Sequence, residues 1–220
     1  MQIHFGDETF ELLIEGGMYW PCESMLLCSD LHLGKEASFS RMGLGVPRGA
    51  SRQTLARVSA MLQRCRAEQL VILGDLFHNR SALAIDVIDL FQRFMEQHHT
   101  LSITLVSGNH DRSAGDLPAD WRMHVEDDRL SLRKIELLHE APSTADSAAD
   151  TDRFRIAGHL HPAVQIRWGD ISGRYRCFWQ TERNLILPAL GQFTGAMTIS
   201  RQPSDKVWAL LDEEIVAIQR

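Results

Sequence analysis

The sequence predicts an α/β fold built on a mostly parallel β-sheet. Three short aliphatic runs, at 25–28, 70–73 and 103–106, have the uninterrupted apolar character of strands buried on both faces. Helical patterns separate these runs, and such alternation is typical of parallel sheets with crossover connections. After Trp121 short strand patterns take over, so we expect a second sheet packed on the first, with the helices outside.

Length and composition limit the class of protein. The chain has 220 residues, of which 44% are hydrophobic, and no Pro/Gly/Ser-rich linker divides it, which favours one domain over residues 1–220. It has no apolar run of about 18 residues and no signal peptide pattern at its start, so we expect a soluble, cytoplasmic protein with no membrane partner. Its four cysteines form no CxxC pair, which argues against a zinc ribbon or a disulfide framework.

The first third of the chain contains a strand, a loop and a helix besides the first aliphatic run. Residues 10–15 resemble a strand followed by a Gly-Gly turn, and the Gly and Pro content of 42–49 predicts a loop. Ser51 is the expected cap of a helix, in which Arg57 and Arg64 face solvent. The apolar residues that recur at helical spacing, and are expected to be buried, are Leu55, Val58, Leu62 and Cys65.

The rest of the chain supplies one more long helix and many short strands. The helix is expected from Leu83 to His98, and the Ala, Ser, Thr and Asp content of 141–152 predicts an exposed, mobile loop. Strands are expected at 123–125, 130–132, 135–138, 154–157, 164–166, 175–178, 185–187, 207–210 and 215–216.

Side chains that can bind metals follow several of the predicted strands. In open α/β sheets ligands bind beyond the carboxyl ends of the strands, where these side chains are expected to meet. Asp30 and His32 alternate along a segment expected to be extended, so both can point toward one ion, and the same holds for His159 and His161. The full set of candidate ligands is Asp30, His32, Asp75, Asn109, His139, His159 and His161.

The chemistry of this set favours two transition-metal ions. Imidazole nitrogens and hard oxygens without a thiolate suit Mn²⁺, Fe or Zn²⁺ better than Ca²⁺ or Mg²⁺. Seven ligands are too many for one catalytic ion with an open position, and they fit two ions that share a carboxylate. Taken alone, Asp75 is more typical of a turn residue and His139 of a structural histidine, so the prediction depends on the whole set.

The order of the motifs resembles that of a known family. Asp-x-His, Gly-Asp, Gly-Asn-His-Asp, an isolated His and Gly-His-x-His follow one another between residues 30 and 161, as in the calcineurin-like metallophosphoesterase superfamily. The resemblance implies a double β-sandwich flanked by helices, in four αββα layers.

The same resemblance implies a role for each candidate residue. Asp75 would bridge two metals, His110 would be the catalytic histidine, and Asp111 would orient it. One metal would be bound by Asp30, His32 and His161, and the other by Asn109, His139 and His159. Two such ions can activate a water and stabilise an in-line displacement at phosphorus.

Four further segments suggest a substrate. The segments at 29–35, 45–49, 74–78 and 137–140 resemble those of the bacterial ligase-associated DNA damage response endonucleases. This implies a phosphodiesterase that uses manganese and acts on DNA during repair, with a DNA ligase, a helicase and a second nuclease as partners. Because the superfamily has many activities, the alternatives are a small-molecule phosphodiesterase, a nucleotide pyrophosphatase, a phosphomonoesterase and a non-catalytic protein-binding scaffold.

Charge gives only local support for binding to DNA. The net charge of −6 provides no global attraction to nucleic acid, so affinity for DNA is expected to be weak and sensitive to salt. No acidic residue occurs between Ala37 and Ala67, and a loop in this window carries Arg41 and Arg48. We expect these two arginines to contact phosphate groups of the substrate.

Overall fold

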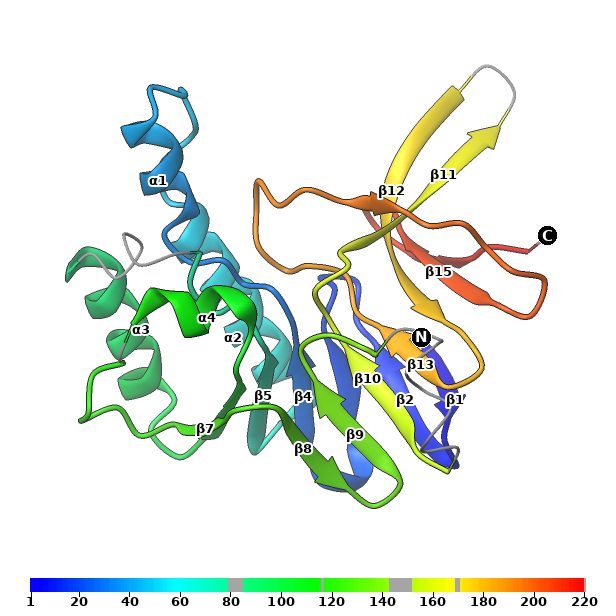
Figure 1. Cartoon of the computed structure of the whole chain (residues 1–220), viewed down its shortest axis with the longest axis horizontal. Helices are drawn as coiled ribbons and strands as arrows, with labels where there is room; N and C mark the ends of the chain where they lie inside the picture. Colours follow the sequence, from blue (N-terminus) through cyan, green and yellow to red (C-terminus); the bar gives the residue numbers. More distant parts are fainter. Residues whose placement is uncertain (79–84, 116, 143–151, 169–170, 220) are drawn as a thin grey trace.

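Two mixed β-sheets pack face to face in the computed structural model, and helices flank them (Figure 1). The structure describes residues 1–78, 85–115, 117–142, 152–168 and 171–219. This is the α/β fold with a two-sheet sandwich that the sequence predicted. The expected loop at 141–152 falls almost entirely on residues outside the described ranges.

The first sheet has the three predicted aliphatic strands at its centre. Strands β4 to β7 pair in parallel, whereas β1 to β4 are joined by antiparallel pairings. The sequence did not predict β1 and β3. In spatial order the strands are β1 (Gln2–Phe5), β2 (Glu8–Leu12), β3 (Met18–Trp20), β4 (Met25–Cys28), β5 (Gln69–Leu73), β6 (Ser102–Val106) and β7 (His124–Glu126).

The second sheet contains the remaining strands. Its spatial order is β14, β11, β12, β13, β10, β9 and β8, and β15 pairs with both β12 and β16. Strand β10 is parallel to its neighbours β9 and β13. The strands are β8 (Arg129–Leu132), β9 (Ile135–Leu138), β10 (Phe154–Ala157), β11 (Pro162–Trp168), β12 (Ile171–Gln180), β13 (Asn184–Ile186), β14 (Met197–Thr198), β15 (Lys206–Leu210) and β16 (Ile215–Ala217).

The central strands of the first sheet are apolar throughout because both of their faces are covered. Side chains alternate across a strand, so Leu26 and Cys28 of β4 pack under the helices, whereas Met25 and Leu27 face the second sheet. The covering helices are α2 (Ala50–Cys65) and α3 (Ile85–Gln97), which bury residues such as Val58 and Phe91. The predicted helices at these two places are therefore confirmed, although residues 83 and 84 lie outside the described ranges.

The helices of the described residues all lie on the first sheet's side of the molecule (Figure 1). They include two short ones that the sequence did not predict, α1 (Lys35–Arg41) and α4 (Asn109–Ala114), besides a 3-10 turn at Pro21–Glu23. Within the described ranges no helix covers the outer face of the second sheet, where a fourth layer was expected. That face carries a small apolar cluster of Val164, Cys177, Ile199, Val207 and Ala209.

The start of α2 differs from the prediction. Ser51 lies inside the helix, and the residue before the helix is Gly49, with a φ of 89°. The carboxylate of Glu36 accepts hydrogen bonds from both the backbone N–H and the hydroxyl of Ser51, at 3.0 and 2.9 Å. A charged acceptor from α1 therefore satisfies the first turn of α2, in place of the Ser51 side chain.

One of the two arginines that were expected to face solvent does not. Arg57 is half-buried and donates a hydrogen bond of 2.6 Å to the carbonyl of Leu190, so that prediction was wrong. Arg64 is exposed as predicted and forms an ion pair with Glu15. In the described part of the chain, no helix is long and apolar enough to cross a membrane.

Candidate metal centre

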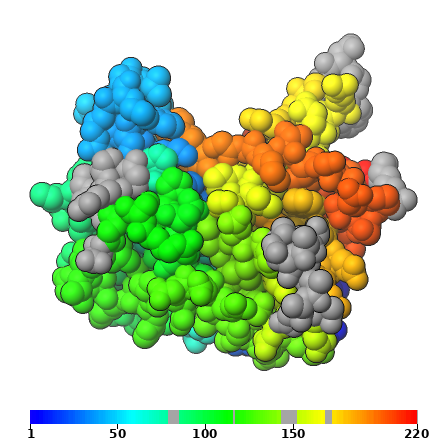
Figure 2. All heavy atoms as spheres, viewed as in Figure 1, coloured from blue at the N-terminus to red at the C-terminus, as the bar shows by residue number. Residues whose placement is uncertain are grey.

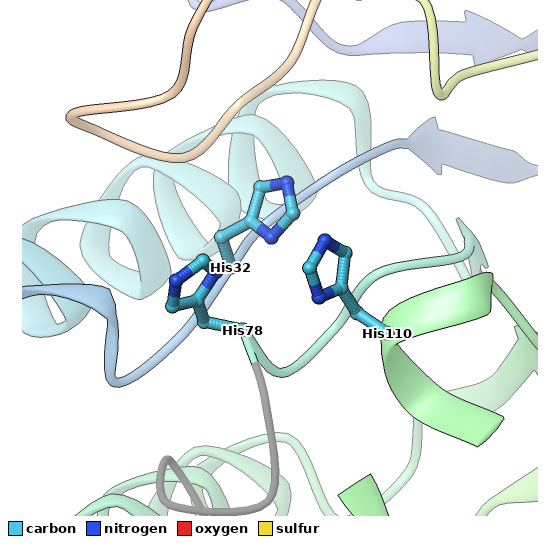
Figure 3. Close-up of side chains that lie close together, drawn as sticks. All are labelled: His32, His78 and His110. Carbon is cyan, nitrogen blue, oxygen red and sulfur yellow. The ribbon is translucent and has the colours of Figure 1, made fainter. Parts of the chain in front are cut away.

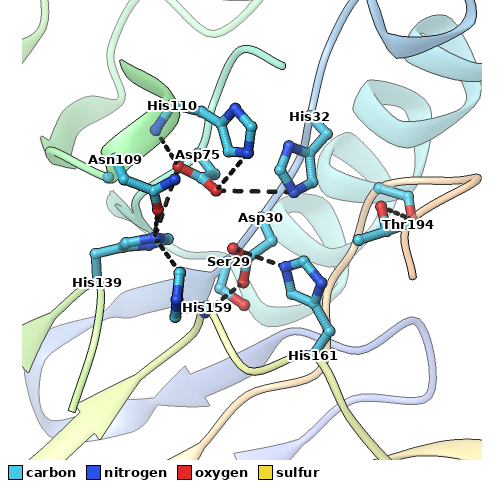
Figure 4. A network of polar contacts seen from close by, with 12 residues as sticks. Ser29, Asp30, His32, Asp75, Asn109, His110, His139, His159, His161 and Thr194 are labelled. Atoms are coloured by element: carbon cyan, nitrogen blue, oxygen red, sulfur yellow. Dashed lines mark hydrogen bonds and ion pairs between the residues drawn. The ribbon is translucent and has the colours of Figure 1, made fainter. Parts of the chain in front are cut away.

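The candidate ligands meet where the loops of the two sheets come together (Figure 4). Asp30 follows β4, Asp75 follows β5, and Asn109 begins α4 after β6. His139 follows β9, and both His159 and His161 lie between β10 and β11. The structure thus brings all seven predicted residues to one place, from strands of both sheets.

The sequence predicted an extended backbone at Asp30 and His32 and at His159 and His161. This prediction was wrong. All four residues, and Asp75 as well, have φ values between 46° and 63°, in the left-handed region. At Asp30 and His32 this conformation accompanies hydrogen bonds between the loops after β4 and β5: the N–H of Asp30 donates to the carbonyl of Gly74 and that of His32 to the carbonyl of Asp75. Such residues cost about 1–3 kcal/mol each and cluster at functional sites.

Asp30, His32 and His161 form a first group of ligand atoms, all within 4.8 Å of one another. Asp30 and His32 are buried, and Asp30 Oδ1 lies 3.2 Å from His161 Nε2. Among the described residues, Asp30 Oδ1, His32 Nε2 and His161 Nε2 find no hydrogen-bond partner. Because buried polar atoms are rarely left unpaired, this group fits a bound cation.

Charge in the first group also favours a cation. Burial alone would raise the pKa of Asp30, but the neighbouring imidazoles of His161, His139 and His32 outweigh it and lower that pKa. Burial lowers the pKa of His32 to about 3, so its ring is neutral and offers lone pairs near pH 7. The group therefore presents an anionic oxygen of Asp30 beside the neutral imidazole of His32.

Two histidines are held in the tautomer that a metal requires. His161 Nδ1 lies 3.0 Å from the carbonyl oxygen of Gly195, and His139 Nδ1 lies 3.0 Å from that of Leu73. Because a carbonyl oxygen only accepts, each Nδ1 must carry the proton, which leaves each Nε2 with a lone pair. Metal-binding histidines are commonly oriented in this way.

A second group of ligand atoms is centred on His139 Nε2, and its other members belong to Asp75, Asn109 and His159. That nitrogen lies 3.0 Å from Asn109 Oδ1, 3.0 Å from His159 Nδ1 and 3.6 Å from Asp75 Oδ1. Ligands about 2.1 Å from one ion stand about 3 Å apart when they are at right angles. The second group therefore also has the spacing of a metal site.

Asp75 lies between the two groups. Its Oδ2 is 3.8 Å from His32 Nε2, and its Oδ1 faces His139 and accepts a hydrogen bond of 3.0 Å from the backbone N–H of His110. Burial raises the pKa of Asp75, because the side chain is 2% exposed and a buried charge is costly. A cation on each side would offset that cost.

Glycines precede several of the ligands because the loops approach one another closely. A Cβ on Gly158 would lie 2.5 Å from Asp30 Oδ2 and 2.6 Å from Ser29 Cβ. A Cβ on Gly108 would collide with the carboxylate of Asp75. A side chain at either position would push apart the residues that make up the groups.

His110 and Asp111 differ in their surroundings. The His110 ring is 35% exposed, and its Nε2 lies 3.9 Å from Asp75 Oδ2, on the open side of the centre. The carboxylate of Asp111 was expected to orient this ring, but its oxygens accept hydrogen bonds from the N–H groups of Gly108 and Phe77, at 2.9 and 3.2 Å. Asp111 therefore ties together the loops after β5 and β6 and fixes the start of α4.

His78 is a site residue that the sequence analysis missed. Its ring lies 5.3 Å from that of His110 and 5.6 Å from that of His32, and the three form a further group of potential ligands (Figure 3). Burial, with help from Lys35 and His110, lowers its pKa to about 4. Its position at the end of the segment Gly-Asp-Leu-Phe-His was the available signal, which had been used only for the resemblance.

The two candidate phosphate-binding arginines lie apart from the ligand groups. Both were predicted to lie on a loop. Arg41 is instead the last residue of α1, whereas Arg48 does lie in the loop before α2. Both are exposed, on the projection that α1 forms beside the body of the molecule (Figure 1).

The chain is similar to known proteins in sequence and in structure. The sequence profile described as calcineurin-like phosphoesterase matches residues 24–199. The crystal structure of the Pseudomonas putida nuclease MPE shares 31% identity over 99% of both chains, with a TM-score of 0.83. No curated protein sequence matches the chain.

Two more distant structures also align. The Escherichia coli phosphoesterase Yfce shares 18% identity over 88% of this chain and 96% of its own, with a TM-score of 0.42. Zinc-bound Vps29 from Entamoeba histolytica shares 14% identity over 88% of this chain and 96% of its own, with a TM-score of 0.40. These two similarities are too low to indicate the function of this chain.

Proposed function

This chain belongs to the calcineurin-like phosphoesterase family and is a metal-dependent phosphoesterase, and we propose that it is a dinuclear phosphodiesterase that cuts DNA during repair. The observation that carries the proposal is the position of Asp75. Its two oxygens face different groups of ligand atoms, with His32 on one side and His139 on the other. One carboxylate can thereby serve two ions.

The chain offers a complete set of ligands for each ion. Asp75 would be shared by the two ions, and the remaining ligands would divide as the structure groups them. Asp30, His32 and His161 would hold one ion, and Asn109, His139 and His159 would hold the other. Imidazole and oxygen ligands favour Mn²⁺, with Fe or Zn²⁺ as the alternatives.

Bound divalent ions supply positive charge that offsets repulsion from the phosphate and lowers the pKa of a water. The residues of the chain do the rest. As the water oxygen bonds to phosphorus it gives up a proton to solvent, the bond to the leaving oxygen breaks, and His110 donates a proton to that oxygen from the open side of the centre. Asp111 holds His110 in place through its hydrogen bond to Gly108 at the start of α4.

DNA is the substrate that two observations favour. The nuclease from Pseudomonas putida resembles this chain over its whole length, and the exposed Arg41 and Arg48 can contact a phosphate backbone. With a net charge of −6, binding to DNA is weak and depends on salt. We further propose that the protein acts in the cytoplasm with a DNA ligase, a helicase and a second nuclease.

The test is hydrolysis by the wild type and by Asp75→Asn in parallel. Substrates are bis-p-nitrophenyl phosphate, p-nitrophenyl phosphate, a dinucleoside pyrophosphate, and single-stranded, gapped and duplex DNA, each with Mn²⁺. We expect cleavage of the diester and of DNA by the wild type and neither by the variant. Turnover of the monoester or the pyrophosphate alone would replace the nuclease by a phosphatase or pyrophosphatase, and no turnover with any metal would favour a scaffold.

A further inference from the structure

The connection between β13 and β14 carries an unusual aromatic side chain. Phe193 is 38% exposed, whereas every other Phe, Tyr or Trp whose side chain the structure describes is buried or half-buried. Its φ of 57° is in the left-handed region, where a bulky residue is a true outlier. An exposed and strained aromatic residue contributes little to the core, so its position needs another explanation.

The segment around Phe193, residues 190–196, is anchored to the metal centre and is called the rim loop below. The N–H of Leu190 donates to the carbonyl of Ser29, and that of Gly191 donates to the carbonyl of Asp30, at 3.0 and 2.9 Å. At the other end of the loop, the carbonyl of Gly195 accepts the hydrogen bond from His161 Nδ1. The rim loop thus contacts two candidate ligands of the first group.

Two half-buried arginines hold the start of the rim loop. Arg57 donates to the carbonyl of Leu190 at 2.6 Å, and Arg176 donates to the carbonyl of Ala189 at 2.7 Å. Hydrogen bonds from charged donors are stronger than neutral ones. The backbone that leads to Phe193 is therefore held at two successive carbonyls.

The rim loop connects the first ligand group with exposed positive charge. In the view of Figure 4 the residue after Phe193, Thr194, lies on the same side of the site as His32 and His161. On the other side of Phe193 along the chain, Gln192 donates a 2.7 Å hydrogen bond to Gln53, and the neighbour of Gln53 is the exposed Arg52. Successive Cα atoms are about 3.8 Å apart, so Phe193 lies within about 8 Å of both Gly191 and Gly195, measured between Cα atoms.

The surface around this region is hollowed. Figure 2 shows a depression between the projection of α1 and that of β11 and β12, with the segment that follows β13 on its floor. Proteins bind single strands of nucleic acid in such grooves by stacking bases on exposed aromatic rings while cations follow the phosphates.

We propose that Phe193 stacks on an unpaired nucleobase of the substrate, one or two nucleotides from the phosphate that is cut. The proposal rests on the proposed function, because it assumes that a nucleic acid strand reaches the metal centre. It adds a preference for single-stranded or gapped DNA, since a base paired within a duplex cannot offer its face to the ring.

The experiment measures the coupling between the ring and one base. Wild type, Phe193→Ala and Phe193→Trp are assayed with Mn²⁺ on a single-stranded oligonucleotide and on a series in which one abasic position moves along it. We expect Phe193→Ala to raise KM for the intact strand about tenfold and Phe193→Trp to keep it near wild type. For wild type, KM should rise by a similar factor when one particular position of the strand is abasic. For Phe193→Ala, KM should be the same whether or not that base is present.

Stability separates a binding role from a structural one. Glycine adopts the left-handed conformation without strain, so Phe193→Gly should melt no lower than wild type and still show the raised KM. The control is Val125→Ala, which removes an exposed apolar side chain from the edge strand β7 and should change neither quantity.

The outcomes distinguish this inference from the proposed function. Wild-type cleavage of DNA with unchanged KM in Phe193→Ala, or abasic effects of equal size in both proteins, would overturn the stacking role and leave the nuclease intact. Hydrolysis of bis-p-nitrophenyl phosphate without any cleavage of DNA by wild type would overturn the nuclease, and the stacking role with it.

Discussion

The two sheets contribute different chemistry to the metal centre. The loops of the first sheet supply the carboxylates, and Asp30 and Asp75 are 0% and 2% exposed. The loops of the second sheet supply only imidazoles, and the His159 and His161 side chains are 31% and 19% exposed. Each ligand group takes members from both sheets, so neither sheet holds a complete group. The packing of the two sheets is therefore a condition for metal binding as well as for stability.

The largest expected effect comes from the one carboxylate that faces both groups. Asp75→Asn should lower the rate of diester hydrolysis by roughly 10⁴-fold or more, because it removes the negative charge that faces both proposed ion sites. Metal content measured on purified protein should fall at both sites. Without metal the variant should melt no lower than wild type, since burial of the charge is costly and the oxygen that accepts from His110 remains.

Asp30→Asn is the matched control for this prediction. It replaces a buried carboxylate whose Oδ1 faces His161 in the first group and whose Oδ2 accepts a hydrogen bond only from the backbone of His159, so one ion should be weakened more than the other. Two tightly bound ions and full activity in Asp75→Asn would contradict the role of Asp75 as the carboxylate that serves both ligand groups.

A second prediction separates proton transfer from metal binding. His110→Ala should keep the metal content of wild type and lose about 10³-fold in the rate on diesters with poor leaving groups. Its rate on bis-p-nitrophenyl phosphate should fall much less, because that leaving group needs no proton. Equal losses on both substrates would place the role of His110 in binding or structure.

A third prediction tests the contact between the sheets. Gly158→Ala places a methyl group of the second sheet's loop against Asp30 and Ser29 of the first, which should cost about 1–3 kcal/mol of unfolding free energy and weaken the first group. Gly45→Ala is the control, because a Cβ there meets no atom within 4 Å among the described residues. Denaturant unfolding and metal titration measure the two effects, and equal behaviour of the two variants would contradict the close fit.

The smallest effect concerns a histidine outside both groups. His98 packs on Phe94 and bonds to Ser59, and burial lowers its pKa below the ordinary value of about 6.5. As pH falls below that value, the unfolded chain takes up a proton that the folded protein does not, so stability decreases. As the pH is lowered from about 7.5 to 5.5, the melting temperature of His98→Gln should therefore fall slightly less than that of wild type. An identical loss in both proteins would assign the acid sensitivity to other groups.

The sequence was informative where the chemistry follows directly from the strands. Buried on both faces, β4, β5 and β6 appear as aliphatic runs, and the polar residues after them were identified as candidate ligands. In the structure His161 lies beside Asp30 and His159 beside His139, while their assignment to two metals stays a prediction.

Features that depend on tertiary contacts were not predictable in the same way. The left-handed conformation of Asp30 and His32 arises from hydrogen bonds to a loop far away in the sequence. Arg57 looks solvent-facing on a helical wheel, yet it binds a carbonyl of the rim loop that only the folded chain brings near. Helix α4 has six residues, too few for a helical pattern to be recognised.

The hydrogen bond between Ser29 and Pro188 joins residues that are 159 positions apart. During synthesis, the strands of the first sheet and their carboxylates emerge long before the loops that carry His159, His161 and the rim loop. Because contacts between distant residues form late and require most of the chain, a nascent protein holds its acidic ligands well before it can complete either group. The candidate ligand groups can therefore be completed only after His161 has emerged from the ribosome.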